Sequence, residues 1–234
     1  MTLATVGDLI QEVYVQLHDD RLRARWSETE LLDYLNQGFE EAIAIRPEIG
    51  AVTATIPLVT GTKQAVPENG VRLLDISRNM DGETPGRVIR QVDRDNLDGT
   101  DPDWHTAAPA SVIWEFTYDP KREPKAFYVN PPAAAGTEIE LVYSRVPEYV
   151  PVSGWEGELI PLDNIYHAAW VNYVVYRALN KMVDYAMEDG RATQHLRQFY
   201  FLIGAKHEAD KLSAPREKPE RPRRETREER DDEG

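Results

Sequence analysis

Hydrophobic residues recur every three or four positions at the start of the chain, which is the repeat of one face of an α-helix. A first stripe comprises Val6, Leu9, Ile10, Val13 and Leu17, and a second comprises Leu31, Leu32, Leu35, Phe39, Ala42 and Ile43. Ser27 and Glu30 precede the second stripe with the spacing of a capping box, in which each side chain bonds to the backbone N–H of the other. Arg46-Pro47 follows this stripe, and proline disfavours helical geometry in the residue before it. The pattern therefore predicts two N-terminal helices, the second beginning after Ser27 and ending before Pro47.

From about residue 51 to 150 the apolar positions alternate instead, most clearly over 138–143. Alternation is typical of strands with one buried face. The runs predicted as strands are 51–58, 71–77, 87–92, 111–118, 126–130 and 137–145, and turn signals such as Glu68-Asn69-Gly70 and Asp119-Pro120 separate them. Short strands at this spacing predict an antiparallel β sandwich or a small barrel.

Helical periodicity returns near Asp163, a candidate N-cap, and is predicted to continue to about residue 183. The segment 165–179 is apolar almost all round, and a helix without a consistent polar face is buried on most sides. We therefore expect part of this helix to face another subunit, with candidate interface residues Trp170, Tyr173, Val174 and Tyr176. Glu188-Asp189-Gly190 is predicted to break the chain before a final helix over about 191–212.

The composition shifts abruptly after Ser213 to seven basic and eight acidic side chains with no large apolar residue. Such a segment cannot bury enough surface to offset its ordering entropy, so we expect it to fold only on a partner. Its arginines are compatible with a nucleic acid or with a protein of mixed charge. The interleaved carboxylates nearly cancel them and favour the protein.

These patterns together predict an α+β fold. Its parts are a four-helix bundle made of two N-terminal and two C-terminal helices (1–50 and 160–212), an inserted antiparallel β sandwich or barrel (51–159), and an extended charged C-terminal tail (213–234).

Charge changes this picture by narrowing the possible partners. The 234 residues include 27 Lys and Arg against 41 Asp and Glu, a formal net charge of −14. This surplus repels phosphate backbones, so it argues against a general nucleic-acid binder but not against a protein that nucleic acid passes without binding. The N-terminal residues lack the pattern of a signal peptide, and no stretch approaches the ~20 apolar residues of a membrane helix, so we expect a soluble protein with no membrane partner.

Candidate chemistry is sparse. The chain has no cysteine, which excludes disulfides, thiolate metal sites and cysteine nucleophiles, and its five histidines lack the spacing of a helical zinc site. Five aspartates gather in 93–103, but the EF-hand template would put Arg94 at its first ligand position, so an acidic loop or a short helix capped by Asp93 is expected. No phosphate-binding loop, nucleophile elbow or recognisable acid–base pair occurs. We predict no catalytic residue, no metal, no cofactor and no enzymatic activity.

Four groups of segments resemble the head-to-tail adaptors of short-tailed bacteriophages. These are WSETELLDYLNQGFEEAIAIRPE (26–48), GVRLLDISRNMDGETPGRVIRQVDRDNLDGTDPDWH (70–105), FYVNPP (127–132) with ELVYSRVP (140–147), and IYHAAWVNYVVYRALNKMVDYA (165–186). The large β region is similar to that of the tail tubular protein A type, because smaller adaptors are nearly all helical. The charged tail is the part that matches least well.

The resemblance implies a structural virion protein of the tail or neck, assembled in the host cytoplasm. Family members form a homo-oligomeric ring, usually a dodecamer, beneath the portal protein; the ring extends the DNA channel and is a platform for tail nozzle or tail fibre proteins. Genomic DNA then passes through the lumen during ejection without specific binding. The C-terminal segment often reaches into the portal, which makes its arginines candidate portal-docking residues: Arg216, Arg221, Arg223, Arg224, Arg227 and Arg230.

Two other functions stay open at this point. A carbohydrate-binding or carbohydrate-processing virion protein would use the predicted β insertion, with Trp104, Trp114 or Trp155 stacked on sugar in an open groove near paired carboxylates. A DNA-packaging factor would grip DNA through the arginines of the tail, and steep salt dependence of DNA binding would identify it.

Overall fold

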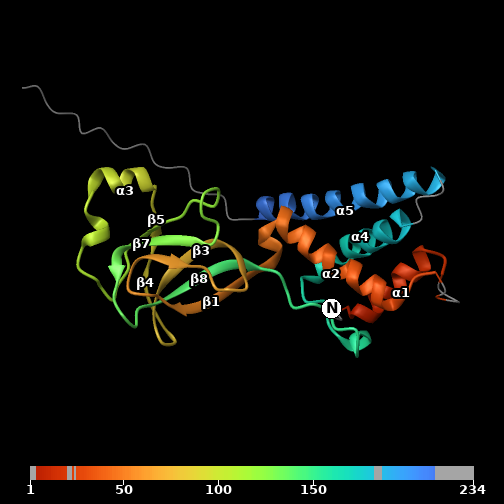
Figure 1. The fold of residues 1–234 in the computed structure, drawn as a ribbon, viewed down its shortest axis with the longest axis horizontal. Helices are drawn as coiled ribbons and strands as arrows, with labels where there is room; N and C mark the ends of the chain where they lie inside the picture. The colour runs from red at the N-terminus through yellow and green to blue at the C-terminus, as the bar shows by residue number, and fades with distance from the viewer. Residues whose placement is uncertain (1–3, 20–22, 24, 182–185, 214–234) are drawn as a thin grey trace, which may run out of the picture.

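The structure is a computed structural model, and it describes residues 4–19, 23, 25–181 and 186–213, without the side chains of 186–189 and 205–213. Four helices gather at one end of an elongated molecule: α1 (Val6–Gln16), α2 (Glu28–Ile45), α4 (His167–Asn180) and α5 (Ala186–Ser213). We call this group the helical module. The strands, with α3 (Arg94–Thr100), form the β module at the other end (Figure 1).

The β module contains two four-stranded sheets around one hydrophobic core. The first sheet has the order β1 (Ala51–Pro57), β8 (Glu138–Arg145), β3 (Gly70–Asp81) and β4 (Thr84–Val88). The second has the order β2 (Gly61–Ala65), β7 (Ala126–Ala133), β6 (Glu115–Thr117) and β5 (Arg90–Gln91). Alternating residues such as Ile76, Phe127 and Leu141 point inward and are buried, as the period of two requires.

The predicted four-helix bundle is wrong. The described residues form an α+β fold with five α-helices, one of which, α3, belongs to the β module. Within the helical module, α4 packs against α1, α2 and α5, while α1 and α2 make little contact with each other. The physical reason is the nearly uniform apolar surface of α4, which requires cover on several sides and so places this helix at the centre.

Two further expectations also differ from the structure, and one strand was not predicted. Gly190 does not break the chain but lies inside α5, because packing of a 28-residue helix outweighs the ~1 kcal/mol that one glycine costs. The β module is not purely antiparallel, since β5 and β6 pair in parallel. β2 lacks the alternating apolar residues from which a strand would be predicted, and pairing with β7 sets its register.

The helix caps confirm the predicted start of α2 but not the full capping box. The Ser27 hydroxyl accepts from the Glu30 amide at 3.3 Å, whereas the Glu30 carboxylate turns to α4 and accepts from Lys181 Nζ at 2.7 Å. The complete box is on α1, where Thr5 Oγ1 accepts from the Asp8 amide at 3.1 Å and Asp8 Oδ2 accepts from the Thr5 amide at 3.0 Å.

A long connection over residues 146–163, which we call the strap, joins β8 to the helical module. The Val6 amide donates to the Glu158 carbonyl at 2.8 Å, and Trp155 is buried in the helical core. The Asn36 side chain on α2 accepts from the Val150 amide at 3.0 Å and donates to the Val150 carbonyl at 3.5 Å. The strap is therefore held along its length. Residues 51–159 as one separate inserted domain remain a prediction.

Candidate interaction surfaces

The predicted subunit-interface residues on α4 lie in the core of the single chain. Trp170 and Val174 have no exposed surface, Tyr173 is 5% exposed, and Tyr176 is partly buried. Aromatic neighbours from other helices cover them: the Phe39 and Trp170 rings are 5.1 Å apart, and the Tyr173 and Phe199 rings are 4.9 Å apart. Helix α4 thus finds most of its apolar cover within one chain. Tyr176 keeps some exposed surface, and a role of these residues in a subunit interface stays a prediction.

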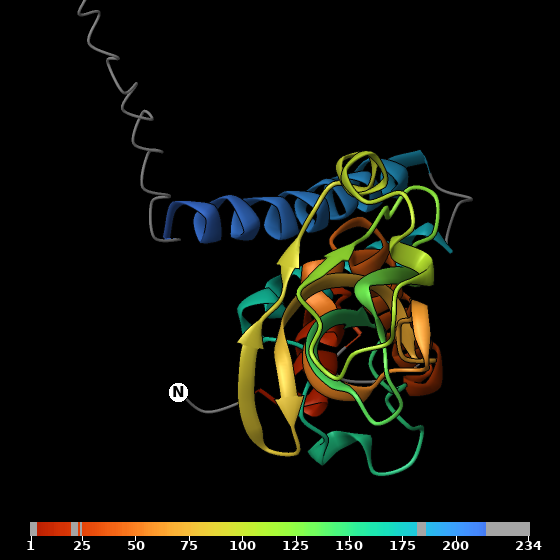
Figure 2. The ribbon, with the colours of Figure 1, turned by 90° about the vertical axis from the view of Figure 1, so that its left-hand side faces the viewer.

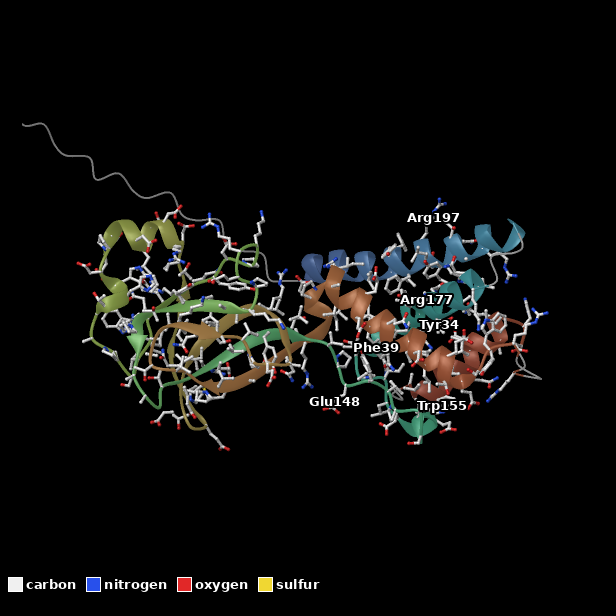
Figure 3. The ribbon with its side chains drawn as sticks, in the orientation of Figure 1. Tyr34, Phe39, Glu148, Trp155, Arg177 and Arg197 are labelled. Atoms are coloured by element: carbon white, nitrogen blue, oxygen red, sulfur yellow. The ribbon has the colours of Figure 1, made fainter. Side chains whose placement is uncertain are left out.

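A polar cluster fixes α2 against α4 at the edge of this core. The Arg177 guanidinium lies 5.0 Å from the centre of the Tyr34 ring (Figure 3). The Tyr34 hydroxyl donates to Glu30 at 2.7 Å, and partial burial together with this bond raises the pKa of Tyr34 to about 12. Partial burial of Glu30 favours its neutral form, but the bonds from Lys181 and Tyr34 prevail and lower the pKa of Glu30. The cluster therefore orients α2 and α4 relative to each other.

Helix α5 has an outer face that no other described part of the chain covers. Its central residue is Phe201, which is 65% exposed, and Gln194, Arg197 and Gln198 surround it. Figure 3 shows Arg197 projecting away from the helical module. Residues 190–204 include Arg191 and Arg197 and no carboxylate, so this face is polar and basic around one exposed aromatic side chain.

The strap forms a second exposed surface, apolar and of opposite charge. Tyr149 is 63% exposed, Val152 59% and Leu159 52%. Residues 146–163 contain four carboxylates and no lysine or arginine. In Figures 1 and 2 the strap runs along the lower side of the helical module, while α5 runs along the upper side.

A groove of about 950 Å³ opens between the strap and the start of the β module. Its apolar walls include Tyr149, Leu159 and Tyr166, and its rim carries Glu148, Glu158 and Asp163. Glu48 also lines it and is ion paired with Arg46 at 3.6 Å; Arg145 is the basic residue of the lining. The groove is large enough for several side chains of a partner.

The β module has a smaller exposed apolar patch at β4 and β6. Val88, Val112 and Trp114 are exposed, and the Arg87 guanidinium lies 5.7 Å from the centre of the Trp114 ring. The other two tryptophans considered for sugar stacking are buried, Trp104 beside Tyr128 and Trp155 in the helical core. The three tryptophans therefore share no groove.

The acidic segment 93–103 forms a short capped helix. The Asp93 carboxylate accepts from the amides of Asp95 and Asn96 at the start of α3. Asp98 accepts from Trp104 Nε1 at 2.8 Å, and this bond, with the nearby Arg94, lowers the pKa of Asp98. Across the described ranges, no three His, Asp or Glu side chains are grouped to hold a metal ion.

The candidate portal-docking arginines, from Arg216 to Arg230, lie outside the described residues. Among the helices that are described, none is both long enough and apolar enough to cross a membrane.

Sequence reasoning missed the buried amides that hold the irregular segments. Gln64 bonds to the backbone of Val59 in the turn after β1, and Asn79 bonds to the backbone of Arg87 and Ile113 across the β module. Asn36 does the same for the strap. Their positions in the sequence could have revealed them. An amide such as Asn36 that stands within the apolar stripe of a helix is buried and must find hydrogen-bond partners there.

Comparison with known proteins identifies one family. A family model described as SU10 adaptor protein matches residues 4–222, which include both the helical and the β modules. No curated protein matches the sequence.

Proposed function

The chain belongs to the SU10 adaptor protein family and is therefore a structural adaptor protein of a phage and a component of the virion; from this premise, we propose that it forms a head-to-tail adaptor ring. In this role the ring docks under the portal protein, extends the DNA channel and gives the tail nozzle or tail fibres a surface to attach to. The large β module favours the tail tubular type within the class.

The observation that carries the proposal is a pair of unlike surfaces on one chain. On the strap, the exposed Tyr149 and Leu159 line one groove, and a cluster of exposed apolar residues marks an interaction site. On α5, one exposed aromatic residue, Phe201, stands within a basic face. The outer face of α5 and the strap lie on opposite sides of the helical module (Figures 1 and 2). Contact between two different surfaces repeats from copy to copy and closes into a ring when the rotation allows it.

The elongated shape fits two tiers around a channel. With the long axis of the chain along the channel, the helical modules form one tier and the β modules the other (Figure 1). The patch around Trp114 on the β module is then the surface offered to tail proteins. The net charge of −14 suits a wall that DNA slides past without being held.

The proposed role is structural and not catalytic. The polar clusters described above cap helices or join elements: Asp93 caps α3, Asn36 holds the strap, and Glu30 links α2 to α4. The tail arginines remain the candidate contacts to the portal, because guanidinium groups form bidentate bonds with carboxylates.

Particle mass by light scattering tests the proposal, with the protein alone and mixed with purified portal rings. A dodecamer of 26.7 kDa chains would have a mass of about 320 kDa. We expect a ring of this order in at least the mixture, with co-sedimentation of portal and adaptor. A protein that stays monomeric under both conditions would overturn the proposal.

A further inference from the structure

The geometry points to one particular contact between copies: the outer face of α5 in one copy packs on the strap and its groove in the next. This inference rests on the proposed ring, because it names the two surfaces that close it. The partner is a second copy of the same chain.

The two surfaces complement each other in shape, because one protrudes and the other is a groove. On α5, Phe201 protrudes from a convex helix with 65% of its surface exposed. On the strap, Tyr149 and Leu159 border a groove of about 950 Å³, within the size range of ligand pockets. A protruding aromatic side chain inserted into a groove is the usual anchor of a protein interface.

The charged parts complement each other as well. The described side chains of α5 over 190–204 include Arg191 and Arg197, with no carboxylate among them. The strap carries Glu148, Glu156, Glu158 and Asp163 without a basic residue. Among the residues that the structure describes, no ion pair joins these four carboxylates to another part of the chain. Opposite charge on the two surfaces favours this pairing and disfavours α5 against α5.

Both surfaces are held firmly enough to present a fixed shape. Ala192, Phe199 and Ile203 anchor α5 in the helical core, and Trp155 and the Asn36 bonds anchor the strap. Because the surfaces lie on opposite sides of the module, a copy can use both at once. That is the requirement for a chain of identical contacts.

Cysteine cross-linking tests the contact directly, because the chain has no cysteine of its own. The variant Phe201→Cys/Leu159→Cys, treated with a bismaleimide, should yield a ladder of covalent oligomers beyond the dimer. Each single variant has a cysteine on only one side of the contact, so it should give no specific cross-link. The control pair is Phe201→Cys/Val88→Cys, since Val88 on the β module is 64% exposed and so equally reactive. A ladder of the same strength in the control pair would overturn the inference.

A charge exchange gives an independent test in mixed assemblies. Arg197→Glu alone places like charges together and should raise the concentration for half-assembly at least about tenfold. Glu148→Lys/Glu158→Lys alone should do the same. Mixed one to one, the two variants should assemble like the parent, because α5 of each meets the strap of the other with opposite charge. Arg122→Glu, on the β module, serves as the control and should assemble normally.

The outcomes separate this inference from the proposed function. A parent protein that forms no ring, alone or with portal, refutes both. A parent ring whose assembly is unchanged by Arg197→Glu, and whose cysteine pair gives no ladder, refutes the contact but leaves the ring. In that case the strap groove is free for the portal or a tail protein.

Discussion

Replacing Asn36 with leucine should detach the strap from α2. The Asn36 side chain accepts from the Val150 amide at 3.0 Å and donates to the Val150 carbonyl at 3.5 Å. Asn36 is 7% exposed and Val150 6%, so water does not reach these groups in the folded chain. Asn36→Leu keeps the volume of the side chain but leaves both backbone groups of Val150 without a partner.

The expected cost follows from those two bonds. A buried backbone N–H left unpaired costs about 1–3 kcal/mol, and the carbonyl adds less because its bond is already long. We therefore expect a loss of about 2 kcal/mol in the free energy of unfolding. For a chain of this length that corresponds to a fall of roughly 4–8 °C in melting temperature.

Thermal unfolding followed by tryptophan fluorescence, together with hydrogen exchange over residues 146–163, measures this effect. Exchange is needed because two modules with separate cores need not unfold as one step. Asn180→Leu, an exposed amide at the end of α4, makes the same chemical change as a control. If both variants melt together and the strap amides exchange as slowly as in the parent, Asn36 does not hold the strap. Loss of the strap should also weaken assembly if the proposed contact is right.

Three further predictions concern the core, the pH dependence and the tail. Trp26 Nε1 donates to the Ala178 carbonyl at 3.2 Å, while the buried Trp170 Nε1 has no hydrogen-bond partner among the described residues. In urea unfolding, Trp26→Phe should therefore lower the free energy of unfolding by about 1–2 kcal/mol more than Trp170→Phe. Because the pKa of Glu30 is lowered, this carboxylate stabilises the fold above its unfolded pKa of about 4.3, and the stabilisation is lost as the pH falls through the folded pKa. The difference in unfolding free energy between the parent and Glu30→Gln should therefore shrink below about pH 4. A difference that stays constant from pH 7 to 3 would contradict this. Deletion of 214–234 should leave the melting temperature of the body unchanged and reduce co-sedimentation with portal rings, more so at low salt; equal binding by both proteins would exclude the tail as the docking segment.

The composition and periodicity of the sequence by themselves determined which stretches form the main elements. The apolar repeat and the Ser27 and Pro47 signals predicted α2 closely, and alternation predicted β1 and β8. These signals are local, because helix and strand repeats follow from the direction of successive side chains. The segment resemblance predicted an adaptor, and the family match confirms that class.

Only the tertiary structure decided which faces of these elements pack together and which stay exposed. The apolar circumference of α4 predicted a neighbour, but it could not say that helices of the same chain, and not a second subunit, cover Trp170. Gly190 continues a helix that its own propensity disfavours, since packing outweighs propensity. The Asn36 amide meets Val150 across 114 positions of sequence, so no local pattern could pair them. The exposed faces of α5 and the strap are likewise what remains once the core is complete, and for that reason the candidate surfaces emerge only from the fold.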